Sequence, residues 1–337
     1  MGDFMKNVSI MDRLLKFFGH KPPVVPKAVN HISTKPIVES SMENNIKVAE
    51  PVVEEKVVPV APSKFAVLIG INKYDPSLGS DLNGCVNDVE SMYKVLVETY
   101  GFPPDNIRML TDFRATKAAI IDRIEWLLTN NAPGDELVLH YSGHGSQVRD
   151  RNGDELVDGL DEILCPTDLN WDDPLTDDTI AYLFKEKPDN VFLTFICDSC
   201  HSGSISRDIS ESNPHNMIKN KYIPPPSDIA HRSIGRDLPV NTFGAVNKLP
   251  NKPVSQKHAL LSGCRDNQTS ADAFVDGKYQ GALTSSLIKA INNNPHRSLT
   301  ELHAEVISIL NVGGYKQKPQ LSGNPGLIKI RNIFGSK

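Results

Sequence analysis

The sequence has no long hydrophobic run and no excess of positive charge. No apolar stretch in its 337 residues approaches the roughly 20 residues that a membrane-spanning helix needs. Residues 1–19 lack the uninterrupted apolar core and the small-residue cleavage site of a signal peptide. The formal net charge of -5 argues against a general binder of nucleic acid or anionic membranes. We therefore expect a cytoplasmic protein with no transmembrane segment and no nucleic-acid partner.

Cysteine is scarce, and its spacing is irregular. The chain has five cysteines: Cys85, Cys165, Cys197, Cys200 and Cys264. An odd, scattered set excludes a disulfide-stapled secreted scaffold and favours a reducing compartment. A chain of this length also buries a core without covalent cross-links, and 39% hydrophobic with 23% charged residues is ordinary for a globular protein.

Composition divides the chain into four parts. Residues 20–63 are rich in proline and alternate short valine runs with charges, so we expect a flexible N-terminal pro-segment that ends at residue 63 and, with the leader before it, spans residues 1–63. Apolar residues at helical spacing within residues 10–18 indicate a short leader helix, which either docks on a membrane or partner or frays. Residues 64–203 form a large catalytic region, 204–256 a proline-rich linker or loop, and 257–337 a smaller region of the same domain.

From residue 64 onward, strand-like runs alternate with helical periodicity. Buried strands are expected near residues 65–71, 106–110, 136–140, 163–164, 191–196 and 258–262, and short extended pieces near 320 and 327–330. Helices are expected near residues 86–97, 116–128, 179–184, 283–291 and 299–310. The alternation predicts an α/β fold, with a mostly parallel central sheet and helices on both faces.

Two strand ends carry the residues suited to catalysis. One is Leu139-His-Tyr-Ser-Gly-His-Gly145, and the other is Ile196-Cys-Asp-Ser-Cys-His-Ser-Gly203. Ligands of open α/β sheets bind beyond the carboxyl ends of the strands, where both motifs lie. A His and a Cys there form the minimal pair for thiolate catalysis, and the backbone N–H groups of Gly145 and Cys200 could form an oxyanion hole.

These motifs resemble the catalytic His and Cys motifs of metacaspases, caspase-like cysteine peptidases. Residues 65–72 resemble the family's first strand, and residues 83–88 the turn that follows it. Residues 262–272 and 318–322 resemble the opening and the end of its small-subunit region, so the resemblance covers about residues 65–327. It implies a caspase-like three-layer sandwich of the type I arrangement, with His144 as general base and Cys200 as nucleophile.

The resemblance also implies a substrate pocket. Asp88, Asp198 and Ser142 would line it, with Cys85 at its wall. A carboxylate-lined pocket attracts Arg or Lys and repels Asp, so we expect cleavage of proteins and peptides after basic residues. The alternative for Asp88 is that it merely caps the helix that begins nearby.

An acidic stretch indicates a calcium site, and no organic cofactor is expected. Carboxylates crowd residues 150–178, and oxygen-rich clusters suit Ca²⁺. The resemblance points to Asp161, Asp177 and Asp178 as ligands. Where many members have a further Asp, seven residues after the nucleophile, this chain has Arg207, so Asp208 is the candidate fourth ligand. The alternative is a solvated acidic loop without metal.

The linker is a candidate for self-cleavage. It offers seven basic residues on flexible backbone: Arg207, Lys219, Lys221, Arg232, Arg236, Lys248 and Lys252. A peptidase that prefers basic residues could cut at any of them, and the N-terminal segment could cover the cleft until removed. The resemblance further implies a monomer.

Two other interpretations remain open. Cys197-Asp-Ser-Cys200 also has the spacing of a C-x-x-C redox or zinc motif, although no second cysteine pair at zinc spacing exists. That interpretation predicts that Cys197 is as indispensable as Cys200. The chain could instead be a catalytically silent scaffold or regulatory protein with a caspase fold, although both His144 and Cys200 are present.

Overall fold

A computed structural model describes the folded part of the chain. It covers residues 62–79, 81–129, 131–149, 160–185, 187–188, 190–200, 218–230, 258–265 and 268–335. All of these lie within one compact unit, Pro59–Lys337. The predicted pro-segment, apart from residues 62 and 63, lies outside the described residues.

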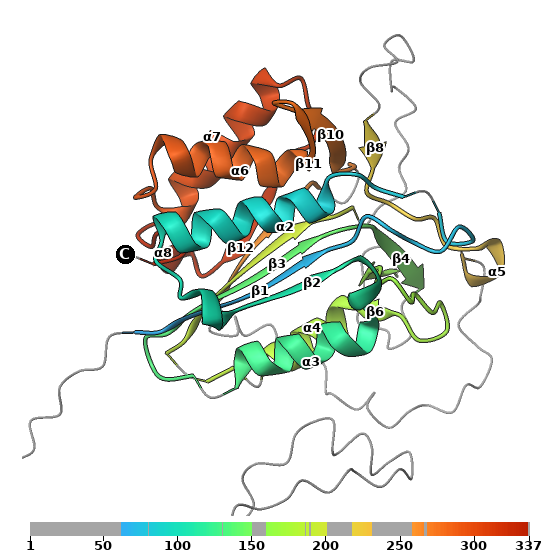
Figure 1. Cartoon of the computed structure of the whole chain (residues 1–337), viewed down its shortest axis with the longest axis horizontal. Helices are drawn as coiled ribbons and strands as arrows, with labels where there is room; N and C mark the ends of the chain where they lie inside the picture. Colours follow the sequence, from blue (N-terminus) through green and yellow to red (C-terminus); the bar gives the residue numbers. More distant parts are fainter. Residues whose placement is uncertain are drawn as a thin grey trace, which may run out of the picture. The chain divides into compact units, whose positions relative to one another are not determined.

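A six-stranded sheet forms the centre of the fold (Figure 1). Its strands are β1 (Lys64–Gly70), β2 (Ile107–Thr111), β3 (Glu136–Ser142), β7 (Phe192–Asp198), β9 (His258–Ser262) and β12 (Gln320–Gly323). Their order is β12-β9-β7-β3-β1-β2, and every neighbouring pair is parallel except β12 with β9. The predicted, mostly parallel sheet is confirmed.

Helices cover both faces of this sheet, as the sequence predicts. On one face lie α2 (Cys85–Lys94, continued by a wider turn at Val95–Thr99), α6 (Ala282–Asn293) and α7 (Leu299–Val312). On the other lie α3 (Lys117–Leu128) and α4 (Asp177–Phe184) (Figure 1). The helix α3 begins where expected, because the Thr116 side chain accepts a hydrogen bond from the Ala119 amide.

The main core lies between the sheet and the α2, α6 and α7 layer. Its buried members come from every one of these elements: Leu68, Val89, Met92, Val138, Ile196, Leu261, Leu287, Ile291, Leu302 and Val306. The C-terminal Ile333 and Phe334 also join this core, and Tyr100 packs edge-on against the Phe334 ring. This packing fixes the position of α2 and α6 against the carboxyl ends of the strands, where the motifs lie.

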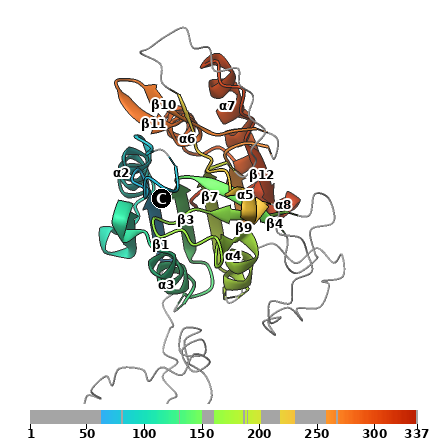
Figure 2. The same ribbon diagram turned by 90° about the vertical axis from the view of Figure 1, so that its right-hand side faces the viewer.

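Two small antiparallel sheets lie at the carboxyl ends of the central strands. One joins β4 (Gly145–Arg149), β5 (Leu160–Leu164) and β6 (Leu175–Thr176). The other joins β8 (Lys219–Asn220), β10 (Ala271–Val275) and β11 (Lys278–Gly281). Figure 2, turned to show this end, places β4, β10 and α5 (Ser227–Ala230) around the ends of β3 and β7.

Three local features differ from the sequence predictions. Residues 218–230 fall in the expected linker, yet they contain β8 and α5 because they pair with β10 and β4. Pro325–Ile328 forms the short helix α8 instead of an extended piece, since the Asn324 side chain caps it. The β10–β11 hairpin is absent from the predictions, although its Asp276-Gly277 turn has the positive φ angles and the residue pair that such turns require.

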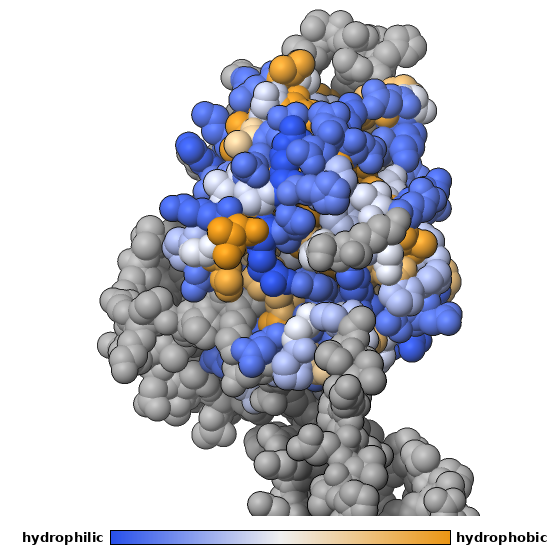
Figure 3. Space-filling model, turned by 90° about the vertical axis from the view of Figure 1, so that its left-hand side faces the viewer, coloured by the Kyte–Doolittle hydropathy of each residue, from blue (hydrophilic) through white to orange (hydrophobic). Residues whose placement is uncertain are grey.

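The described surface is largely hydrophilic. Figure 3 shows hydrophobic side chains only in small separate groups on one side of the molecule. Among the described residues, none of the helices combines the length and apolarity needed to cross a membrane.

Candidate active site

The two motifs meet because their strands are neighbours. The strands β3 and β7 pair in parallel, with Ser142 opposite Asp198. His144 lies two residues beyond the end of β3, and Cys200 lies two residues beyond the end of β7. Parallel pairing therefore carries the predicted base and the predicted nucleophile to the same edge of the sheet.

The Cys200 thiol lies against the backbone of Ser270. The Ser270 amide donates a hydrogen bond to Cys200 Sγ, and Sγ donates to the Ser270 carbonyl oxygen at 3.3 Å. Cys200 is fully buried. A hydrogen bond with the Cys200 thiol, together with burial, raises the pKa of the neighbouring Cys264 thiol, which therefore stays protonated.

Two tyrosines hold His144 in place. The His144 amide donates to Tyr74 Oη at 2.9 Å, and Tyr141 Oη donates to the His144 carbonyl oxygen at 2.7 Å. The imidazole packs on the Tyr74 ring with 4.7 Å between centroids. Gly143 permits this arrangement, because a Cβ there would lie 2.7 Å from Tyr141 Oη and 2.8 Å from Tyr74 Oη.

The carbonyl oxygen of Lys221 occupies the predicted oxyanion hole. It accepts hydrogen bonds from the Cys200 amide at 3.2 Å and from the Gly145 amide at 3.0 Å. The Lys221 amide donates to the Ser270 carbonyl oxygen at 3.1 Å. Asn220, just before Lys221, pairs with Ala271 in the antiparallel β8–β10 ladder. Residues 219–221 thus lie across the site as an added strand, in the way that peptide ligands extend a sheet.

The Lys221 side chain fills the predicted substrate pocket. Its ammonium lies 3.2 Å from Asp198 Oδ1 and 3.4 Å from Asp88 Oδ2, and it donates to Ser142 Oγ at 2.9 Å. Ser142 Oγ in turn donates to Asp88 Oδ2 at 2.7 Å. All four of these side chains are fully buried, and Cys85, also buried, lies at the start of α2 beside them.

The two carboxylates differ in charge. Burial raises the pKa of Asp88 to about 7. The Lys221 charge lowers this pKa but only partly offsets burial, and the nearby Asp198 charge raises it further. Burial acts on Asp198 as well, but Lys221 and the hydrogen bonds from Ser270 and Thr284 hold the pKa of Asp198 below its usual value. The carboxylates, Asp198 foremost, outweigh burial and raise the pKa of Lys221. Asp198 is therefore the ionised partner of the Lys221 ammonium, whereas Asp88 titrates near neutral pH.

A hydrogen-bond network fixes Asp198. Ser270 Oγ donates to Asp198 Oδ1 at 2.6 Å, and the Thr284 amide and hydroxyl donate to Oδ2 at 3.0 and 2.8 Å. His140 Nε2 lies 3.2 Å from Thr284 Oγ1. Burial lowers the pKa of His140 to about 4, so this histidine is neutral and belongs to the packed core of the sheet.

Sequence reasoning missed several residues of this pocket. Gly281 forms part of its wall, because a Cβ there would lie 2.1 Å from Asp198 Oδ2, 2.3 Å from Lys221 Nζ and 2.7 Å from Asp88 Oδ2. The Gly281 amide also donates to both Asp88 oxygens, at 2.9 and 3.0 Å. The Asp88 carboxylate thus faces Gly281 and Lys221. The alternative that Asp88 merely caps a helix is wrong, since α2 begins after Gly84 without a side-chain cap.

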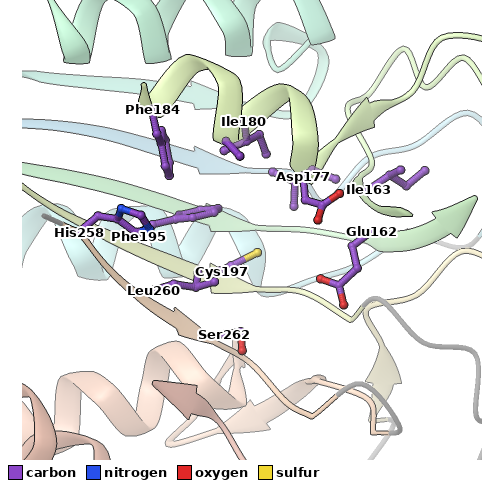
Figure 4. Close-up of a pocket in the computed structure, with 12 residues that line it drawn as sticks. Glu162, Ile163, Asp177, Ile180, Phe184, Phe195, Cys197, His258, Leu260 and Ser262 are labelled. Carbon is purple, nitrogen blue, oxygen red and sulfur yellow. The ribbon is translucent and has the colours of Figure 1, made fainter. Parts of the chain in front are cut away.

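Cys197 faces a separate cavity. It lies on β7 and lines a space of about 200 Å³ beneath α4, with Phe184, Phe195 and Leu260 as apolar walls (Figure 4). Burial raises the pKa of Cys197 to about 12, so its thiol is protonated at neutral pH. No group of three or more potential metal-binding His, Cys, Asp or Glu side chains occurs in the described part of the chain. Cys197 and Cys200 thus lie in different surroundings, unlike a redox or zinc pair.

The predicted calcium ligands lie along the β5–β6 hairpin. Asp161 is on β5, buried and opposite Val148, while Asp177 and Asp178 form the first turn of α4 directly after β6. Glu162 and Asp177 stand at the rim of the cavity in Figure 4. Within the described residues, these carboxylates do not form a three-membered group of candidate metal ligands. Asp208, Arg207 and the acidic residues 150–159 lie outside the described residues, so the described side chains alone do not establish a site.

Comparison with known proteins identifies the family. The family model of the metacaspase peptidase C14 domain matches residues 64–208. Metacaspase-1 of Candida glabrata is 35% identical over 286 residues, which cover 77% of this chain and 72% of that protein. The chain belongs to the metacaspase family.

Other relatives agree with this assignment. Metacaspase-1 of Schizosaccharomyces pombe is 33% identical over 290 residues, covering 76% of this chain and 66% of that protein, so the chain spans slightly less than two thirds of this relative. The crystal structure of protein GSU0716 from Geobacter sulfurreducens matches with a TM-score of 0.59 and 28% identity. This match covers 82% of the chain and all of that structure.

Proposed function

We propose that the protein is a cysteine endopeptidase that cleaves after Lys or Arg and processes itself at the Lys221–Tyr222 bond. The observation that carries the proposal is the position of Lys221. Its carbonyl oxygen accepts from two backbone amides, and its ammonium lies between two carboxylates. A substrate of this enzyme needs both contacts, one for the reacting carbonyl and one for the residue before the cleaved bond.

The chemistry follows from the groups around that carbonyl. The Cys200 thiol passes its proton to His144, and Sγ forms a bond to the carbonyl carbon. The amides of Cys200 and Gly145 stabilise the negative charge that develops on the oxygen. Protonated His144 then gives its proton to the leaving amine, and water hydrolyses the thioester to regenerate the thiol.

Specificity for a basic residue follows from the buried charges. A cation in the pocket neutralises Asp198 and donates to Ser142, whereas an acidic side chain would bring a second or third negative charge into a dry site.

Self-processing follows from the same contact. Because Lys221 is fully buried in the pocket, an external substrate and this segment exclude each other. The first turnover of each molecule is therefore expected on its own chain, after which residues 218–230 can leave the pocket. Of the seven basic residues proposed from the sequence, only Lys219 and Lys221 lie among the described residues, and Lys221 has the geometry of the reacting position.

Calcium remains part of the proposal as an activator. Asp161, Asp177, Asp178 and Asp208 are its proposed ligands, and no step of the chemistry above depends on it. The described carboxylates by themselves do not form a three-ligand group, so the proposal depends on whether Asp208 completes the site. We also propose that the protein acts as a monomer and lies in the cytoplasm; the second point agrees with five buried cysteines that form no disulfide in the described residues.

Hydrolysis of matched fluorogenic peptides tests the function. Peptides ending in Lys, Arg or Asp before the reporter are compared with millimolar Ca²⁺ or with chelator, using the wild type and Cys200→Ala. We expect cleavage after Lys and Arg that needs Cys200. Cleavage that persists with chelator would remove the calcium proposal alone. Absence of any cleavage by folded protein would contradict the peptidase proposal and favour the scaffold interpretation.

A further inference from the structure

The segment bound in the site continues past the proposed cleavage point. Tyr222 forms a parallel bridge with Gly145, and the Ile223 amide donates to the Gly145 carbonyl oxygen at 3.0 Å. Gly145 therefore contacts both sides of the bond, because its amide holds the Lys221 carbonyl oxygen and its carbonyl holds Ile223. Figure 2 shows β4, which begins at Gly145, next to α5, which follows this segment.

Side chains along this segment alternate between burial and partial exposure. Lys221 is buried, Tyr222 is half-buried, and Ile223 is again buried at 2% exposure. Such alternation is typical of an extended chain whose every second side chain enters the protein. Ile223 thus occupies a position equivalent to that of Lys221, two residues further on.

Gly79, in the loop between β1 and α2, forms one wall around Ile223. A Cβ at Gly79 would lie 3.4 Å from Ile223 Cγ1, 3.8 Å from Cδ1 and 3.9 Å from Cγ2. Gly79 has a φ of +153°, which favours glycine, so the loop presents bare backbone to the isoleucine. The same loop carries Asp81, which contacts Lys219 on the other side of the bond.

We infer that the protein has a second specificity site, beyond the cleaved bond, that takes an aliphatic side chain at the second residue after it. This inference rests on the proposed function, because it assigns Lys221–Tyr222 as the reacting bond. The site consists of the Gly79 wall and the Gly145 carbonyl. It selects a branched aliphatic residue by burial, rejects a charged residue by desolvation, and rejects proline, which has no amide hydrogen to donate.

Peptides that keep both sides of the bond test this inference. Doubly labelled peptides with the sequence of residues 219–225, all carrying Ala in place of Lys219 so that only one basic residue remains, are incubated with the self-processed full chain. In this series the position of Ile223 is changed to Val, Ala, Asp or Pro. We expect Ile and Val to be cleaved alike, with kcat/KM falling at least about tenfold for Ala and further for Asp and Pro. Tyr222→Ala is the matched control, with a smaller loss because that side chain is only half-buried.

Equal kcat/KM values for the Ile, Ala and Asp peptides would overturn the second site while leaving the peptidase intact. Failure of the proposed function gives a different result. In that case the Ile peptide is not cut, or the peptide with Lys221→Ala is cut equally fast.

A substitution of Gly79 in the enzyme tests whether this residue forms a wall of the second site. In Gly79→Val, the ratio of kcat/KM between the Ile and Ala peptides is expected to fall, because the valine takes up space next to the isoleucine. This ratio does not depend on how much enzyme is folded. Gly314→Val is the control, since Gly314 also has a positive φ, of +78°, and a Cβ there would meet no atom of the described residues within 4 Å. An unchanged ratio in Gly79→Val would overturn the assignment of the wall.

Discussion

The carbonyl oxygen of Lys221 lies 3.2 Å from the backbone nitrogen of Cys200. Through this contact the chain presents one of its own peptide bonds to its proposed nucleophile. The Lys221 ammonium, buried between Asp88 and Asp198, holds the segment in register. A single lysine therefore occupies both the predicted substrate pocket and the predicted oxyanion hole.

Loss of Lys221 should destabilise the unprocessed protein. In a Cys200→Ala background, which prevents processing, Lys221→Ala leaves buried Asp88 and Asp198 without their cation and should lower the free energy of unfolding by roughly 3 kcal/mol. Lys221→Arg keeps the charge, and Lys219→Ala removes a half-buried lysine, so both should cost less. Denaturant unfolding measures the differences, and equal stability of all four proteins would contradict the buried contact.

Gly281→Ala should close the pocket. The added methyl carbon falls within 2.1–2.7 Å of Asp198, Lys221 and Asp88 atoms, so neither Lys nor Arg fits. We expect kcat/KM for Lys and Arg peptides to fall at least about a hundredfold, by comparison with the loss of a buried charge pair. Circular dichroism shows whether the variant is still folded. Unchanged peptide cleavage would show that Gly281 does not line the pocket.

Binding of basic peptides should strengthen as the pH rises through 7. Burial raises the pKa of Asp88 to about 7 with Lys221 in place, so at lower pH its carboxyl is protonated and attracts a cation less. The Cys200→Ala/Lys221→Ala variant cannot cut and lacks the lysine that fills the pocket. Its Asp88 has no cation to lower its pKa and stays protonated above pH 7 until a peptide binds, so the dissociation constant of a labelled lysine peptide should fall as the pH rises from about 7. Asp88→Asn removes the titrating group, and a persistent pH dependence in that variant would assign the effect to another residue.

The two cysteines of the Cys197-Asp-Ser-Cys200 sequence should behave differently. Cys197 is buried and protonated, and its sulfur lies 3.0 Å from Ser199 Oγ, whereas the Cys200 amide faces the Lys221 carbonyl. Cys197→Ala should keep most of the peptidase activity and Cys200→Ala should lose it, as measured by peptide hydrolysis. Equal loss in both, with folding intact by circular dichroism, would favour the redox interpretation.

Much of the fold is predictable from local patterns. Apolar runs such as residues 136–140 and 191–196 are long and bounded by polar turns, and Thr116 is a strong helix cap, so the central strands and α3 could be predicted within a few residues. Residues 218–230 could not, because β8 has only two residues and forms through pairing with the distant Ala271 and Asp272. Proline-rich composition predicted a loop there, and long-range pairing overrode it.

The site was predictable only in part. Asp88, Ser142 and Asp198 were predictable because they lie in or near sequence motifs that the metacaspase resemblance covers, and the structure brings them together. Gly281 lies outside these motifs and carries no comparable pattern, since a glycine acquires a role only when β11 packs beside α2. Ser270 lies within the 262–272 motif, but its hydrogen bond to Asp198 appears only in the folded structure. The sequence offered seven candidate basic residues and did not indicate which one enters the pocket. The three-dimensional path of the chain decides that it is Lys221.

Self-processing is the most direct test of the account. Intact-mass spectrometry follows five freshly purified proteins over time, with Ca²⁺ and with chelator. They are the wild type, Cys200→Ala, Lys221→Ala, Lys221→Arg and Lys219→Ala. We predict that the wild type, Lys221→Arg and Lys219→Ala yield a fragment ending at residue 221, and that Cys200→Ala and Lys221→Ala do not. A wild type that never cuts after residue 221, or a Lys221→Ala protein that cuts there as fast, would contradict the account.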